Sequence, residues 1–290
     1  MVPLLITMDL ETASDHNINE QNLILKTINS DFSKLNLSLT TFLTSDSLDR
    51  FNESLQDLNT TINEFGIHGF DHSVNENYIL LSEEEIRLNI EYAFNNIRNS
   101  LNRIPEAFRG PFMSTSSLTQ KVLTEKKIRS DFSVCSQRMD FMNSRGGSVK
   151  WLFSPRLPYH PSEDSPYKAG ELPLWVVPLS CIGFPFISSM LYIFGLNFMK
   201  AFYRILLKES IATKKPIVYL FHSYEFTADV KLKRTELKNH NNSFLHNFYI
   251  NDIKRRYELN LSLIRYMLSF DSVCPMNSSQ YINFLERNSD

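Results

Sequence analysis

The sequence contains few cysteines and no cysteine motif. Cys135, Cys181 and Cys274 lie far apart, and no two of them form a CxxC pair. So sparse a set argues against a disulfide framework and against a thiolate metal site. We expect all three to be small buried side chains.

Clusters of basic residues are also lacking. The formal net charge is −2, and no basic block occurs in the 290 residues. Binding of nucleic acid without sequence preference requires clustered Lys and Arg to neutralise phosphates. We therefore expect no nucleic-acid partner.

Signals for secretion or membrane insertion are lacking as well. The N-terminus has neither the basic segment nor the small-residue cleavage site of a signal peptide. A bilayer-spanning helix requires roughly 20 nearly uninterrupted apolar residues. The apolar stretch Ile182–Leu207 is interrupted by Pro185, Asn197, Lys200 and Arg204. We expect a cytoplasmic protein without an integral membrane segment, in which this stretch forms a loop and a core helix.

Short apolar runs alternate with longer segments of helical period, which is the pattern of repeated βα units. The predicted strands are Leu4–Met8, Ser38–Leu43, Thr61–Gly66, Ala107–Arg109, Phe132–Val134, Leu172–Val177, Ile217–Phe221 and Ser272–Cys274. The predicted helices are Glu20–Leu35, Ser45–Leu58, Ser82–Leu101, Ser116–Lys126, Ser188–Thr213 and Phe248–Ser269. No Gly/Ser linker divides the chain, so we expect one domain over residues 1–290. We expect Asn143–Lys168 to be a long irregular excursion over the active-site face.

Two carboxylates follow the first predicted strand. Asp9 and Glu11 are two residues apart and therefore project from the same side of an extended chain. Burying such a pair is costly unless it binds a metal ion or another cation. An Asp at a strand end is also typical of a helix or loop cap, so this segment alone does not establish a function.

Two histidines follow the third predicted strand. His68 and His72 are four residues apart and can converge on one metal ion if the segment turns helically. Imidazole and carboxylate ligands together suit zinc and other first-row divalent ions. Taken alone, the pair is equally compatible with two unrelated loop histidines.

Arg109 and His222 each lie at the end of a further predicted strand. An Arg in this position can hold a neighbouring carboxylate in one rotamer and keep it ionised. A His in this position is well placed as a general acid. A surface Arg and a structural core His are the ordinary alternatives for each residue alone. Because α/β folds place their sites just past the strand ends, the four segments together predict one site.

In this order the four segments resemble the polysaccharide deacetylases, also called the NodB-homology or carbohydrate esterase 4 family, over nearly the whole chain. The ending His222-Ser-Tyr-Glu225-Phe is similar to the HPWEF-like ending of one branch of that family. The resemblance implies an α/β fold, a distorted (β/α)7 barrel that holds a metal ion at the carboxyl ends of its strands.

The resemblance also implies a metal site. His68 and His72 match the two metal histidines of the family. The commonest first motif has two adjacent aspartates, but Leu10 follows Asp9 here, and Glu11 would then be the third ligand. The implied cofactor is a divalent metal, zinc in the first place, with cobalt, nickel or manganese as alternatives.

Catalytic roles follow from the same resemblance. Asp9 matches the general base, His222 matches the general acid, and Arg109 matches the arginine that orients the base. The backbone N–H of Phe112 stands where the family places an oxyanion donor. Glu225 either orients His222 or pairs with a nearby cation.

The activity implied by the resemblance is metal-dependent removal of an acetyl group from the nitrogen of an N-acetylated sugar or glycan precursor. Two alternatives stay open. One is an amidohydrolase on the same scaffold that acts on a small cyclic amide or ureide. The other is a catalytically silent glycan-binding protein that retains the cleft.

Overall fold

The computed structural model describes residues 1–12, 17–60, 62–138, 149–227 and 252–288. Three predicted features therefore lie partly outside the described residues. They are Thr61 of the third strand, residues 143–148 of the excursion, and residues 248–251 of the last helix.

A curved parallel sheet with the strand order β11-β1-β2-β3-β4-β5-β8 forms the centre of the fold, and β12 pairs with the first residues of β1. Its strands are β1 (Val2–Leu10), β2 (Leu39–Leu43), β3 (Glu64–Ile67), β4 (Ala107–Phe108), β5 (Ser130–Asp131), β8 (Trp175–Val176), β11 (Ile217–His222) and β12 (Val273–Pro275). Every residue of β1 and β2 is buried, which is typical of a parallel sheet covered on both faces.

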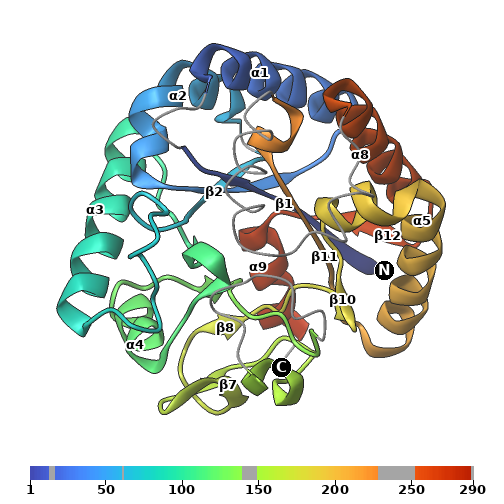
Figure 1. Ribbon diagram of the computed structural model, residues 1–290. Helices are drawn as coiled ribbons and strands as arrows, with labels where there is room; N and C mark the ends of the chain where they lie inside the picture. The colour runs from blue at the N-terminus through green and yellow to red at the C-terminus, as the bar shows by residue number, and fades with distance from the viewer. Residues whose placement is uncertain (13–16, 61, 139–148, 228–251, 289–290) are drawn as a thin grey trace.

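Helices surround the sheet (Figure 1). They are α1 (Ile18–Lys34), α2 (Ser45–Leu58), α3 (Glu83–Leu101), α4 (Ser117–Glu125), α5 (Ser188–Thr213), α8 (Ile253–Leu268) and α9 (Ser278–Asn288). Short 3-10 helices are η1 (Pro111–Met113), η2 (Val149–Phe153) and η3 (Ser223–Phe226). The helix α9 closes the amino-terminal end of the sheet. Its first residue, Ser278, is hydrogen-bonded to Thr40 of β2, and Ser279 donates two hydrogen bonds to Glu64 of β3.

The sheet curls into an incomplete barrel that is open between β8 and β11. Residues 177–187 bridge this opening with single contacts, including the parallel pairing of Ile187 with Leu220 of β11. A short antiparallel pair, β9 (Cys181–Ile182) and β10 (Phe184–Pro185), lies in this segment. The predicted distorted (β/α)7 barrel is thereby confirmed.

The helix α5 is the one helix of the described chain that is long and apolar enough to cross a membrane by length and composition. A core helix passes the same test. The α5 residues that face inward, among them Met199, Tyr203 and Leu206, are fully buried and belong to the main hydrophobic core. Gly195 interrupts the helix with a φ of 81°.

Two predicted strands lie at positions that differ from the predicted ones. The strand predicted at Phe132–Val134 is displaced to Ser130–Asp131, because Gly110 and Pro111 turn the neighbouring chain away beyond β4. The third strand is displaced to Glu64–Ile67.

Other differences concern elements that carry weak sequence signals. The excursion contains an antiparallel hairpin, β6 (Pro161–Ser162) with β7 (Ser165–Ala169), and is therefore not wholly irregular. The helix α9 was not predicted. Cys274 is only partly buried, because β12 pairs with β1 at the start of the sheet.

Candidate metal centre and active site

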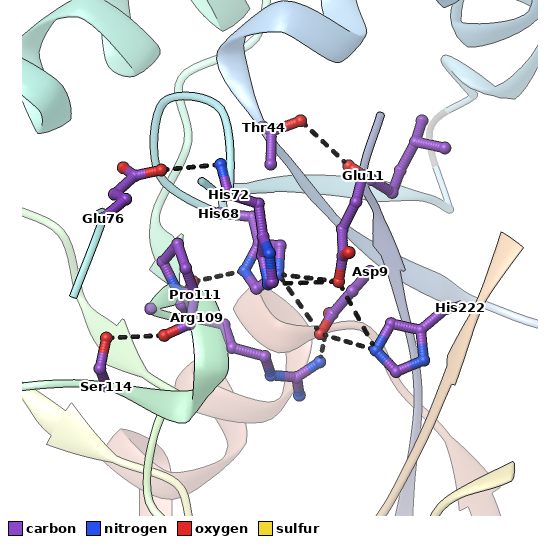
Figure 2. Close-up of polar contacts among 12 residues, drawn as sticks. Asp9, Glu11, Thr44, His68, His72, Glu76, Arg109, Pro111, Ser114 and His222 are labelled. Atoms are coloured by element: carbon purple, nitrogen blue, oxygen red, sulfur yellow. Dashed lines mark hydrogen bonds and ion pairs between the residues drawn. The ribbon is translucent and has the colours of Figure 1, made fainter. Parts of the chain in front are cut away.

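The carboxyl ends of four parallel strands bring the predicted site residues together (Figure 2). Asp9 lies near the end of β1, and the parallel register places it beside His222 at the end of β11. His68 directly follows β3, and Arg109 directly follows β4. Neighbouring parallel strands end at the same edge of a sheet, and residues that are distant in the sequence therefore surround one point.

Glu11, His68 and His72 form a cluster that could hold a metal ion. The Glu11 Oε1 atom lies 3.3 Å from His72 Nε2 and 3.8 Å from His68 Nε2. Two ligand atoms that each lie about 2.0–2.1 Å from a tetrahedral zinc ion are roughly 3.4 Å apart. The spacing therefore fits one small divalent ion.

The orientation of His68 supports this fit. Its Nδ1 atom lies 2.6 Å from the backbone oxygen of Arg109, and a carbonyl oxygen can only accept, so Nδ1 carries the proton. This contact turns Nε2 toward the carboxylates of Asp9 and Glu11. The Nε2 atom is buried and forms no hydrogen bond with any described residue. A ring fixed in this way offers Nε2 to a metal ion.

Burial lowers the pKa of His68, whereas the Asp9 and Glu11 carboxylates raise it, and the net pKa lies above the ordinary value. The imidazole therefore tends to hold a second proton when no cation is bound. A metal ion would compete with that proton for Nε2.

When the imidazoles are neutral, the protein does not balance the buried charges of the site. Asp9, Glu11 and Glu225 are each at most 4% exposed, and Arg109 is fully buried. With the carboxylates ionised and the imidazoles neutral, these four residues carry a formal charge of −2. A buried net charge is costly, and one divalent cation beside Glu11 would neutralise it.

Arg109 orients Asp9 through a buried ion pair. Its Nη1 atom donates to Asp9 Oδ1 at 2.6 Å, and Nη2 donates to the Thr7 hydroxyl at 3.1 Å. With Oδ1 held, the Asp9 Oδ2 atom faces His68 Nε2 at 3.6 Å and His222 Nε2 at 4.0 Å. One carboxylate oxygen is thus fixed, and the other faces the cluster of Glu11, His68 and His72.

His222 lies on the opposite side of this point and remains partly accessible. Its Nε2 atom lies 3.7 Å from Glu11 Oε1, while Nδ1 lies 3.1 Å from Glu225 Oε1. The Tyr192 hydroxyl donates to the second Glu225 oxygen at 3.3 Å. The structure thus places Glu225 against His222, which is the first of the two predicted arrangements.

The charge around His222 favours its protonated form. Burial lowers the pKa of His222, but the hydrogen bond and the charge of Glu225 raise it, and Glu11 and Asp9 add to that effect. The net pKa lies above the ordinary value. An imidazole in this state can donate a proton from Nε2.

Phe112 lies in the turn η1, where Phe112 and Met113 have positive φ values of 56° and 57°. The Phe112 ring contacts the His72 ring, with centroids 4.3 Å apart. Asp131 supports the turn, because it accepts from Ser133, which in turn accepts from the Gly110 N–H. The role of the Phe112 N–H as an oxyanion donor stays a prediction.

Two residues that support the site from behind, Tyr192 and Glu76, carry no clear signal in the sequence. Tyr192 lies in an apolar helix 33 positions before Glu225, and its spacing is typical of a core residue. Glu76 lies in an irregular loop and shows no periodic pattern. A carboxylate four residues after the second histidine was the only available signal for Glu76, and it is a weak one.

Comparison with known proteins gives matches among solved structures only. Neither a protein-family model nor a curated protein matches the chain. A structure from Mycobacterium smegmatis, assigned to the polysaccharide deacetylases, matches with a TM-score of 0.65 and 13% identity over 99% of this chain and 91% of that one. A similarly assigned structure from Pseudomonas aeruginosa PAO1 gives a TM-score of 0.60 and 14% identity over the same shares. The chain has the polysaccharide-deacetylase fold.

This fold does not by itself select a substrate. Puue allantoinase matches with a TM-score of 0.60 and 13% identity, over 99% of this chain and 91% of that one. The polysaccharide-deacetylase fold therefore occurs in structures whose names indicate different substrates. The choice between substrates depends on the side chains of the site.

Replacing Arg109 tests the buried ion pair. In Arg109→Met the Asp9 carboxylate stays buried without its guanidinium, and we expect the free energy of unfolding to fall by about 3–5 kcal/mol. Adding Asp9→Asn removes the uncompensated charge and should restore a substantial part of that loss. Urea denaturation of the metal-free proteins measures both values. Equal stabilities of the single and double variants would contradict the ion-pair interpretation.

Proposed function

We propose that the protein is a metal-dependent N-deacetylase that hydrolyses the acetamide of an N-acetylated sugar or glycan precursor. One observation supports this proposal above the others. A three-ligand cluster of Glu11, His68 and His72 lies beside an oriented carboxylate, Asp9, and a partly accessible imidazole, His222. A nucleophile, a base and an acid can thus act on one amide group.

Glu11, His68 and His72 would hold the divalent ion, with zinc as the first candidate and cobalt, nickel or manganese as alternatives. When bound, such an ion supplies Lewis acidity, which lowers the pKa of a coordinated water and polarises a carbonyl oxygen. Three protein ligands leave positions for water and substrate, as in other catalytic zinc sites.

Asp9 is the general base in this proposal. Its Oδ1 atom is held by Arg109, and its Oδ2 atom faces the proposed metal ligand His68. Asp9 accepts a proton from the water as the water oxygen attacks the amide carbon. Arg109 contributes by keeping the carboxylate aimed.

His222 is the general acid. It donates the Nε2 proton to the amide nitrogen as the carbon–nitrogen bond breaks, which releases acetate and the free amine. Glu225 holds Nδ1 and favours the protonated ring. The Phe112 N–H shares the negative charge that develops on the carbonyl oxygen.

A second candidate is hydrolysis of a small cyclic amide or ureide. The similarity to the allantoinase structure favours this candidate. The same acid and base would act on a ring amide, and the reaction would release no acetate. The nature of the products therefore separates the two activities.

Two single substitutions separate metal binding from acid catalysis. We expect His68→Ala to lose bound metal, because it removes the most buried ligand of the cluster. We expect His222→Ala to retain metal and to lose about 10²–10⁴ of the turnover, the usual contribution of a general acid. Elemental analysis and an acetate-release assay measure the two effects. If both variants bind metal and turn over normally, the assigned roles are wrong.

A substrate panel tests the activity itself. The zinc-loaded protein should release acetate from N-acetylated amino sugars or their oligomers, and His222→Ala should release far less. Turnover of cyclic ureides without acetate release would support the second candidate. A metal-free protein that binds glycans and turns over neither class would be a silent binding protein and would contradict the proposal.

A further inference from the structure

The loop that carries His72 has an unusual backbone. It lies between β3 and α3, and it contains Gly69 with a φ of 83° and His72 with a φ of 56°. Non-glycine residues rarely adopt a left-handed φ unless their surroundings impose it. Some contact must therefore hold this loop in place.

The contact is with one buried carboxylate. Glu76 accepts the successive N–H groups of Phe70 at 2.5 Å, Asp71 at 3.0 Å and His72 at 2.8 Å. Oε1 receives the first of these hydrogen bonds, and Oε2 receives the other two. Figure 2 shows the Glu76 carboxylate against the His72 main chain, on the side away from Asp9. Successive N–H groups that point at one anion form a concave anion-binding turn.

Glu76 is itself held from behind. The Tyr78 hydroxyl donates to Oε1 at 3.2 Å, and the Asn89 amide of α3 donates to the same atom at 3.4 Å. Tyr78 is fully buried and packs edge-on against Phe108 of β4. The carboxylate therefore connects the loop to α3 and to the core of the sheet.

The charge of Glu76 has no cationic partner among the described residues within ion-pair distance. Glu76 is 4% exposed, so its desolvation must be offset by hydrogen bonds, chiefly those of the loop amides. A change in the conformation of the loop would break these hydrogen bonds and leave the buried carboxylate unsatisfied. The loop also wraps closely around the carboxylate, because a Cβ added at Gly69 would lie 2.5 Å from Glu76 Oε1.

We infer that Glu76 is a positioning residue for the metal ligand His72, because it fixes the main chain of residues 70–72 and so places the His72 imidazole opposite Glu11. This inference rests on the proposed metal site. The two metal histidines are held by different means. His68 is oriented by its own ring through the Arg109 carbonyl, whereas His72 is placed through its backbone.

Glu76→Gln tests this inference with a minimal change. Glutamine replaces one acceptor oxygen with an NH2 group, which can only donate. In one orientation the Phe70 N–H loses its acceptor, and in the other the Asp71 and His72 N–H groups lose theirs. The loop should therefore relax whichever orientation the amide adopts.

The measurement is the zinc affinity of the full-length protein, obtained by competition with a chelator. We expect Glu76→Gln to weaken zinc binding about 10–100-fold, the usual effect of removing a residue that supports a metal ligand. The matched control is Glu64→Gln. Glu64 is a partly buried carboxylate at the opposite end of β3 and accepts from the backbone N–H and hydroxyl of Ser279. Its substitution should change zinc affinity by less than about twofold, since it lies outside the metal site.

A double-substitution cycle with His72→Ala separates positioning from a general loss of stability. If Glu76 acts through His72, Glu76→Gln should have little further effect on zinc affinity in the His72→Ala background. Multiplicative losses in the double variant would overturn the inference. Should Glu76→Gln not fold, Glu76→Asp withdraws the carboxylate by one methylene while keeping its charge, and carries the same expectation.

The outcomes also separate this inference from the proposed function. Wild-type protein that binds zinc, together with Glu76→Gln that binds it equally well, overturns only the role of Glu76. Wild-type protein that binds no zinc overturns both proposals.

Discussion

The site depends on the burial of negative charge at the carboxyl end of β1. Asp9 and Glu11 are both almost inaccessible to solvent, and Glu225 adds a third carboxylate behind His222. Arg109 offsets one of these charges through its ion pair with Asp9. When the imidazoles are neutral, the remaining charge favours the binding of a divalent cation, because burial of an uncompensated carboxylate costs several kcal/mol.

Supporting carboxylates hold the segments that carry the candidate site residues. Glu76 holds the loop of His72, Asp131 holds the turn of Phe112 through Ser133, and Glu225 holds the ring of His222. Each carboxylate is buried. Glu76 and Glu225 accept hydrogen bonds from the segment they support, whereas Asp131 acts on its turn through Ser133. The strands thus place the candidate site residues, and these contacts orient their side chains.

The alternation of strands and helices and the clustering of the site could be predicted because both follow from short-range rules, whereas the barrel was implied by the family resemblance. Apolar strands that end in polar residues place Asp9, His68, Arg109 and His222 at one edge of a parallel sheet. The position of β5 could not be predicted, because a short strand of Ser130 and Asp131 gives no apolar signal. The contacts of Glu76 could not be predicted either, because its three hydrogen bonds to backbone amides form only when the loop has folded.

The most direct test is X-ray absorption at the zinc edge of the loaded protein, combined with the same measurement on Glu11→Gln. The account predicts a single ion with two imidazole nitrogens and one carboxylate oxygen at about 2.0–2.2 Å, and loss or lengthening of the carboxylate shell in the variant. A wild-type spectrum with fewer than two imidazoles, or an unchanged spectrum in Glu11→Gln, would contradict the ligand set on which the proposed chemistry depends.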